Sequence, residues 1–435
     1  MNETVSSGYL KSLLKTLPEL STGPLPWLNQ LRSQAIDRVG MLRMPTTRDE
    51  EWRFTDISPL IKLPFQPAQI TSQLQSADIE SFYLEEATTR LVFIDGHYAP
   101  ELSNVPDKSN IIAGNLSEIA LTHTDIIAAH LGQYVEFQDN VFAAFNTAFL
   151  LDGAVIIIPH DTSVTTPVHL LFIATQKEVT SYSRCLVIGE TGSNATIIED
   201  YVALQESTYV TNTVTEISLA ARAQVNHIRV QRDSNQAFHF ANAAVSLAHT
   251  SHYQSVNITL GARISRHNLN VRLTDEASTC AIDGLALIAD QQLADTHTDI
   301  DHLKPHGTSR QLHKCIVDGA AHAVFNGRIM VHPNAQRTNS SQSSRNLLLT
   351  RKAHVDTKPQ LEIFADDVKC AHGATVGQLD NEEIFYLKSR GLSEIAARNL
   401  LTYAFGAEII DRISIASLRN QLEQTVLEQT QSSKL

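Results

Sequence analysis

Cys370 and His372 are the residues whose types and spacing point most clearly to chemistry. They lie two positions apart in the run DDVKCAHGAT, so in a strand both side chains would project from the same face. A thiolate and an imidazole side by side are ligands that suit iron or zinc. A neighbouring imidazolium or Lys369 would also lower the pKa of the thiol and make it a sulfur acceptor. Two ligands cannot close a site, so more donors must come from elsewhere in the chain or from a partner. The alternative is a buried cysteine that acts as a small apolar side chain beside a hydrogen-bonded histidine.

A second set of possible ligands lies in residues 295–302, DTHTDIDH. In a strand, His297, Asp299 and Asp301 would share one face, and hard or borderline metals accept both ligand types. A stand-alone metalloenzyme built on this stretch is therefore one hypothesis. No fourth ligand follows at a fixed metal spacing, which favours instead a polar strand face whose side chains contact water.

The composition and the missing motifs argue against several classes of protein. Lys plus Arg number 34 and Asp plus Glu number 47, a formal net charge of −13, so nucleic acid is not an expected ligand. The sequence has no GxSxG, no P-loop and no GxGxxG after a predicted strand, so we expect no nucleotide site in this chain. No apolar run approaches the length of about 18 residues that spans a membrane. The N-terminus lacks the order of a secretory signal and the four cysteines are scattered, so we expect a cytoplasmic protein.

Proline and hydrophobic patterns predict the elements that position these residues. No proline occurs from 168 to 304, which indicates continuous hydrogen-bonded structure because proline removes a ladder donor. Within 190–375, apolar and polar residues alternate in many short runs, the signal of half-buried strands. Small-residue corners such as 221–223 and 276–278 separate the runs and lack the Asn-Gly and Asp-Gly of tight hairpins. This pattern suits a β-solenoid, in which each rung stacks on the previous one. A β-sandwich is the alternative that the pattern alone leaves open.

Both ends of the chain are predicted to be helical. Residues 1–60 contain helix-like apolar runs interrupted by a proline cluster. The run NEEIFYLKSR reaches Gly391, and Ser393 has the right type and place to cap a second helix. The stretch after Asn420 is rich in Gln, Glu and Ser and is expected to fray. An apolar stripe with a spacing of four would pack the second helix against the solenoid; its members are Leu401, Phe405, Ile409 and Ile413.

The motif around Cys370 also carries a family resemblance. Residues 359–391, PQLEIFADDVKCAHGATVGQLDNEEIFYLKSRG, resemble the signature of the SufD family, subunits of the SUF iron–sulfur cluster assembly scaffold. The similarity extends upstream through 302–339 and 346–360, and EEWRFTDIS and LVFIDGHYAPELS resemble the N-terminal part of that family. It covers most of the chain. The sister SufB family shares the C-terminal pattern but has extra cysteines, and here no cysteine precedes Cys185.

The resemblance implies a mainly β fold, a right-handed parallel β-helix flanked by N-terminal and C-terminal α-helical domains. It implies an N-terminal helical domain at 1–85 and a connecting α/β segment at 86–150. The β-helix core would then occupy 151–380 and a C-terminal helical domain 381–435.

The resemblance also implies a non-catalytic scaffold subunit that supports de novo cluster assembly and transfer. Such a subunit pairs with a SufB-like chain through the β-helix and docks a SufC-like ABC ATPase on its C-terminal helices, where we expect Arg390 and Arg398 to be exposed docking residues. By motif, His372 matches the family's interface histidine, a metal or cluster ligand shared with the partner chain, and Cys370 matches the adjacent cysteine. The iron–sulfur cluster would be transient on the complex, flavin is associated with the complex, and the isolated chain would hold no tightly bound cofactor. Homodimers are a further expectation.

Two alternatives accompany this interpretation. The first is a SufB-like paralogous scaffold, against which the absence of cysteine before Cys185 counts. The second is a β-helix enzyme acting on polysaccharides, which would need export and a groove rich in aromatic residues. Aromatics make up only 6% of the chain, which argues against such a groove.

Overall fold

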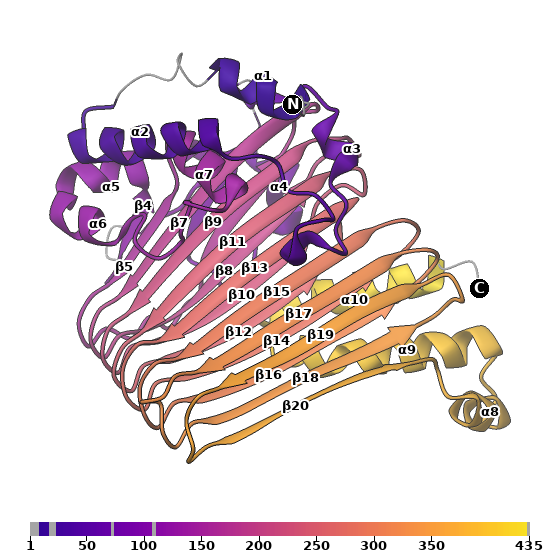
Figure 1. The fold of residues 1–435 in the computed structure, drawn as a ribbon. Coiled ribbons are helices and arrows are strands. Elements are labelled where there is room, and N and C mark those ends of the chain that lie inside the picture. The colour runs from indigo at the N-terminus through magenta and orange to yellow at the C-terminus, as the bar shows by residue number, and fades with distance from the viewer. Residues whose placement is uncertain (1–7, 17–22, 71–73, 107–109, 433–435) are drawn as a thin grey trace, which may run out of the picture.

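The chain folds as a long β-helix with helices at both ends. The computed structural model describes residues 8–16, 23–70, 74–106 and 110–432 (Figure 1). Within these residues, parallel strands stack along one axis, and helices cover parts of the two outer faces. The predicted mainly β fold with a parallel β-helix core and flanking helices is therefore confirmed.

The strands belong to two ten-stranded sheets. The first sheet contains β1 (Gln66–Pro67), β4 (Ile112–Asn115), β5 (Ala154–Ile158), β7 (Val179–Gly189), β9 (Val210–Leu219), β11 (Phe238–Leu247), β13 (Ile264–Leu273), β15 (Leu293–His302), β17 (His322–Val331) and β19 (His354–Ile363). The second sheet contains β2 (Thr89–Ile94), β3 (His97–Tyr98), β6 (Val168–Ala174), β8 (Asn194–Ala203), β10 (Gln224–Arg232), β12 (His252–Thr259), β14 (Thr279–Ile288), β16 (Thr308–Val317), β18 (Asn339–Leu348) and β20 (Lys369–Gly377). From β5 onward, successive strands alternate between the sheets, so the described chain forms eight rungs that end with β19 and β20.

The corners between strands stack from rung to rung. Arg222 and Ala277, which lie at two of the predicted small-residue corners, have left-handed backbones with φ of 59° and 56°. Each donates its backbone N–H to the corner of the next rung: Arg222 N to His249 O at 2.9 Å and Ala277 N to Pro305 O at 3.1 Å. These bonds satisfy backbone groups that a turn would otherwise leave unpaired. The corners therefore continue the solenoid instead of reversing the chain.

The first sheet supplies an apolar column to the interior. Val245, Val271, Ile300 and Ile329 are partners in register on four successive strands, and none is more than 2% exposed. Burying an aliphatic side chain of this size contributes about 1.5–3 kcal/mol. Like residues stacked in every rung therefore stabilise the register of the whole solenoid.

Most of the N-terminal helices cover the outer face of the first sheet near β7, β9 and β11 (Figure 1). They are α1 (Gly8–Thr16), α2 (Pro26–Met41), α3 (Ser58–Ile61), α5 (Leu116–Thr122), α6 (Thr124–His130) and α7 (Val141–Ala148), with the 3-10 helix η2 (Glu50–Trp52). The helix α7 is buried along its whole length; the Asn140 side chain caps it, and the Phe142 and Phe240 rings stack with 3.9 Å between their centres. The short helices α4 (Ser76–Ile79), η3 (Glu80–Phe82) and η4 (Pro100–Leu102) pack instead against β2 and β6 of the second sheet.

The C-terminal helices are α8 (Asn381–Ser389), α9 (Glu394–Ile410) and α10 (Ala416–Ser432). As predicted, Gly391 separates the first two, with a φ of 99°, and the Ser393 side chain accepts a hydrogen bond from Ala396 N at 3.1 Å. Three members of the predicted stripe pack on the outer face of the second sheet: Ile409 and Ile413, which follows the end of α9, are fully buried there, and Phe405 is partly buried. Leu401 is only partly buried and lies outside this cluster.

The expectation that the chain frays after Asn420 is wrong for the described residues. The helix α10 continues to Ser432 because Leu422 and Val426 are fully buried in the same cluster against the second sheet. Tertiary packing of one apolar face therefore outweighs a polar composition. Among the described residues, no helix combines the length and apolarity needed to cross a membrane.

Candidate functional site

The C-terminal end of the solenoid is open. The last two strands, β19 and β20, pair only with β17 and β18, and no described strand lies on their other edges. Every residue of β20 except Cys370 is exposed. Exposed apolar side chains flank this end, including Phe364, which is 62% exposed, and Val376. A long unprotected edge of this kind is a template for pairing with another chain.

Cys370 and His372 lie on the inner face of β20, at the mouth of the solenoid. Cys370 is in register with Ser340 of β18, and His372 is in register with Gln342. Both β18 residues are buried in the interior, at 2% and 3% exposure, and Cys370 packs against the interior cluster. The prediction that the thiol and the imidazole share one strand face is therefore confirmed. Because no described strand stacks in front of them, the His372 side chain is exposed and makes no hydrogen bond or ion pair with a described residue.

A polar network lies directly behind these two residues. Gln342 Nε2 donates to Gln311 Oε1 at 2.9 Å, and Gln311 Nε2 donates to Thr298 Oγ1 at 2.9 Å. The Ser340 and Ser309 hydroxyls are 2.7 Å apart. Such a network fixes the inner face of β18 in one arrangement, and β18 in turn positions β20. This polar interior was not predicted from the sequence, because alternation identifies the two faces of a strand but not which face lies inside.

The Cys370 thiol is not activated within this chain. Burial raises its pKa, and a backbone hydrogen bond with Ser340 only partly offsets that effect. The prediction that an imidazolium or Lys369 lowers the pKa of the thiol is therefore wrong for the isolated chain. Sulfur chemistry at this position requires charges or metal supplied by another molecule.

The other three cysteines are buried inside the solenoid: Cys185, Cys280 and Cys315 are at most 3% exposed. Burial raises the pKa of Cys280 and of Cys315 to about 12, and it raises that of Cys185 as well. Thiols of this kind are structural. Cys370 is the only partly exposed cysteine of the chain.

His297, Asp299 and Asp301 share the outer face of the first sheet, as predicted, but their surroundings differ. Asp299 pairs with Arg328, Asp301 is partly buried, and both line a pocket on this face. His297 contacts Asp295 at 3.0 Å and Glu51 at 3.1 Å, and Asp295 also pairs with Arg266 at 2.7 Å. Although burial lowers the pKa of His297, these carboxylates raise it overall. No three ligand atoms from this stretch converge among the described residues.

The two arginines assigned to docking differ in their surroundings. Arg390 is exposed at the end of α8, where its guanidinium lies over the Tyr386 ring, 5.2 Å from its centre. Arg398 is half-buried, and its Nη2 donates to Leu349 O at 3.4 Å. The assumption that Arg398 is an exposed residue is therefore wrong, because α9 lies with that side against the end of β18.

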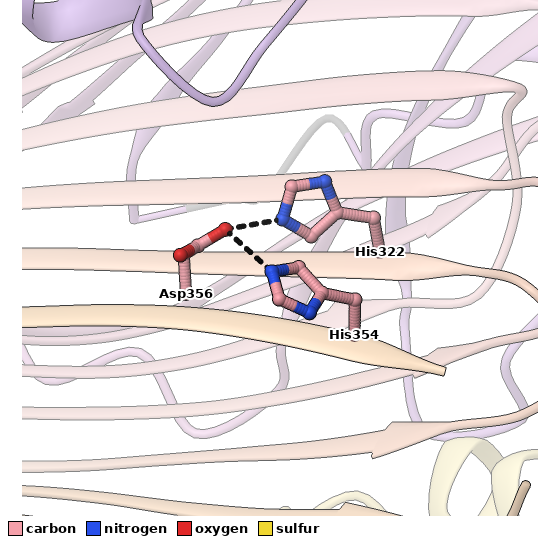
Figure 2. A group of neighbouring side chains, drawn as sticks. All are labelled: His322, His354 and Asp356. Atoms are coloured by element: carbon pink, nitrogen blue, oxygen red, sulfur yellow. Dashed lines mark hydrogen bonds and ion pairs between the residues drawn. The ribbon is translucent and has the colours of Figure 1, made fainter. Parts of the chain in front are cut away.

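One cluster was missed by the sequence reasoning. His322 begins β17, and His354 and Asp356 lie at the start of β19, on the outer face of the first sheet (Figure 2). One carboxylate oxygen of Asp356 lies 2.8 Å from His322 Nε2 and 3.2 Å from His354 Nε2. The spacing of 32 residues between the histidines gives no local motif, so only the strand register could have identified the group.

The comparisons with known proteins agree with this architecture. Residues 172–405 match the family described as SUF system FeS cluster assembly, SufBD core domain, and residues 5–170 match the SufBD protein N-terminal region. An iron-sulfur cluster assembly SufBD family protein of Synechocystis is 44% identical over 91% of this chain and 89% of its own length. The iron-sulfur cluster assembly protein SufD of Escherichia coli is 34% identical over 90% of both chains, and that of Bacillus subtilis is 25% identical over 97% of both. The chain therefore belongs to the SufBD family of SUF-system iron–sulfur cluster assembly proteins.

Proposed function

We propose that this chain is the SufD-type scaffold subunit of a SUF complex and that it presents Cys370 and His372 to a SufB-like partner. The observation that carries the proposal is their position on the inner face of an exposed edge strand that pairs with β18 and has no described strand on its other edge. A partner that extends the second sheet beyond β20 would close the mouth of the solenoid over both side chains. The site would then be complete only in the complex with the partner and not in the isolated chain.

The donor set supports a shared site. One thiol sulfur and one imidazole nitrogen are too few to hold an iron–sulfur cluster, which normally has four protein ligands. Histidine does replace cysteine in mixed-ligand clusters, so His372 can serve as a ligand or a proton donor for a cluster built across the interface. The cluster is the cargo of this site. Because burial raises the pKa of Cys370 in the free chain, the thiol stays protonated until the partner or the metal arrives.

We assign docking of a SufC-like ABC ATPase to α8 and the start of α9. These helices extend past β20 (Figure 1) and expose several apolar side chains, namely Phe385, Tyr386, Ile395 and Leu400. Arg390 lies over the Tyr386 ring. Exposed apolar groups of this kind are typical of interaction surfaces. The other side of α9 is occupied by packing against the second sheet, so only this side is available to a partner.

The decisive experiment is His372→Ala in a complex co-expressed with the SufB-like and ATPase subunits of the same host. The variant should leave the fold and the complex intact, because the side chain is exposed and makes no hydrogen bond or ion pair with a described residue. It should abolish cluster formation, measured by iron and sulfide content and by visible absorption. His354→Ala, on the outer face of β19, is the control and should be milder: the complex should keep the sulfide content and the visible absorption of the wild type. A His372→Ala complex that acquires clusters at the wild-type level contradicts the proposal.

Docking is tested separately with Arg390→Glu. This reversal should weaken ATPase binding and leave the melting temperature unchanged, because Arg390 is exposed. Arg398→Glu is a poorer probe since it would also break the contact with Leu349. Arg48→Glu, an exposed reversal in the N-terminal region, is the matched control. Unchanged ATPase affinity in Arg390→Glu and in a Phe385→Glu variant would place the docking surface elsewhere.

The remaining expectations are tested on the same material. A pull-down from the native host should recover a SufB-like chain and an ABC-type ATPase. Flavin on the complex, if present, is visible in the absorption spectrum of the purified assembly, and homodimers of this chain are measured by mass in solution. A non-catalytic role predicts that ATP hydrolysis requires the ATPase subunit.

A further inference from the structure

We infer that His322, His354 and Asp356 form a binding site for a divalent first-row transition-metal ion, separate from Cys370 and His372. The inference does not depend on the proposed function. It rests on the convergence of two imidazole nitrogens and one carboxylate oxygen at a single accessible point on the outer face of the first sheet (Figure 2).

The backbone fixes two of the three ligands. His322 and His354 are direct register partners at the first positions of β17 and β19, and their rings lie 4.9 Å apart. Asp356 follows His354 by two positions, so its side chain leaves the same face of the strand. Ligands carried on paired strands are held more closely in place than ligands on loops.

The distances agree with metal coordination. Zinc and similar ions bind imidazole nitrogen and carboxylate oxygen at about 2.0–2.2 Å, which places adjacent ligand atoms about 2.8–3.1 Å apart in octahedral and about 3.3–3.6 Å apart in tetrahedral coordination. The two distances from Asp356 Oδ2 to the imidazole nitrogens are 2.8 and 3.2 Å, and all three ligand atoms lie within 4.8 Å of one another. Only a small rotation of the histidines is needed to place an ion between them.

The exposure of the three side chains leaves room for an ion and for its remaining ligands. The His354 side chain is 65% exposed, and those of His322 and Asp356 are 25% and 26% exposed. An ion held from the protein side would keep open positions toward solvent for water or a further ligand. Two histidines and one carboxylate with open positions suit ferrous iron or zinc, whereas the absence of sulfur makes this a poor site for an iron–sulfur cluster. The site therefore differs in chemistry from the one on β20.

The test uses the full chain, stripped with a chelator and titrated with Zn²⁺ alone by calorimetry, and with Co²⁺ alone by visible absorption. We expect one equivalent of metal per chain. Loss of an outer-sphere partner of a metal ligand typically weakens binding 10–100-fold, so His322→Ala, His354→Ala and Asp356→Asn should each weaken it at least about tenfold. His354→Ala is the safest variant, because the side chain is mostly exposed and its loss should leave the melting temperature unchanged.

Two controls separate this site from other metal-binding groups. His160→Ala removes an exposed histidine next to Asp161 and should leave the titration unchanged. Cys370→Ser should also leave it unchanged, since the thiol lies on the inner face of a different sheet. The inference is overturned if His322→Ala and His354→Ala bind metal as the wild type does, or if Cys370→Ser abolishes the binding.

Discussion

Replacing His313 with phenylalanine should remove about 2 kcal/mol of the pH dependence of stability between about pH 7.5 and about pH 5. His313 lies inside the solenoid, where its ring stacks on Phe325 with 4.7 Å between centres. Gly284 on the neighbouring strand makes room for the ring, because a Cβ there would lie 2.4 Å from His313 Nδ1. The Nε2 atom has no hydrogen-bond partner among the described residues. Burial therefore lowers the pKa of His313 to about 4.

The sign and the size of the pH dependence of stability follow from proton binding to His313 in the folded and unfolded chains. An unfolded histidine has a pKa of about 6.5, so between that value and about 4 the unfolded chain binds a proton that the folded chain does not. Stability is therefore full above about pH 6.5, falls as the pH falls through this window, and levels off below about pH 4. At about pH 5 the unfolded histidine is almost fully protonated and the buried one is mostly neutral, which corresponds to about 2 kcal/mol. Phenylalanine keeps an aromatic ring against Phe325 and cannot titrate.

The assay is urea unfolding of wild type and His313→Phe at both pH values. His302, whose pKa burial also lowers to about 4, is present in both proteins, so its contribution cancels in the difference. His160→Asn, at an exposed position, is the control and should keep the wild-type pH dependence. Equal pH dependence in wild type and His313→Phe, within a few tenths of a kcal/mol, would refute the assignment of a buried neutral histidine.

Three other changes test how the fold is held together. Ile409→Ala, at a fully buried position of α9, should cost about 2–5 kcal/mol of unfolding free energy by urea titration; a loss well under 1 kcal/mol would mean that α9 does not pack as described. Cys280→Ser should cost about 1–3 kcal/mol if the hydroxyl stays unpaired, yet the folded protein should still support cluster assembly; lost assembly at an unchanged melting temperature would show that this thiol handles sulfur. Glu216→Ala should cost about 3–5 kcal/mol because it leaves the buried Arg184 guanidinium without its carboxylate. Asp139→Ala, which removes a 94% exposed partner of a surface pair, should cost less than about 1 kcal/mol, and equal losses in these two variants would contradict the role of burial.

Local sequence signals were sufficient to predict elements whose structure depends on a single segment of the chain. Alternation predicted strands in 190–375, and the small corners at 221–223 and 276–278 are turns that stack from rung to rung. Gly391 and Ser393 marked the boundary between α8 and α9 because a left-handed residue and a side-chain cap are local requirements. The shared face of Cys370 and His372 also followed from the period of a strand alone.

The surroundings of individual side chains could not be predicted from local sequence signals. The pKa of Cys370 is raised because the interior cluster desolvates the thiol. The sequence shows the neighbours Lys369 and His372, but it does not show that the thiol is buried. The sequence predicts an exposed Arg398, because helical spacing does not show that the end of β18 lies against this side chain. In both cases the deciding neighbour is distant in the sequence.

Register explains why one site was visible in the sequence and the other was not. The spacing between register partners is 26 residues from Phe238 to Ile264 and 32 from His322 to His354, because the corners and the strand between them differ in length. A single extra corner residue would shift every pairing and move side chains to the opposite face. Cys370 and His372 avoid this uncertainty because both lie on one strand. A site assembled from two strands of a solenoid can be predicted only after the corner lengths are known, so the outer faces of such proteins are where unrecognised metal-binding groups should be sought.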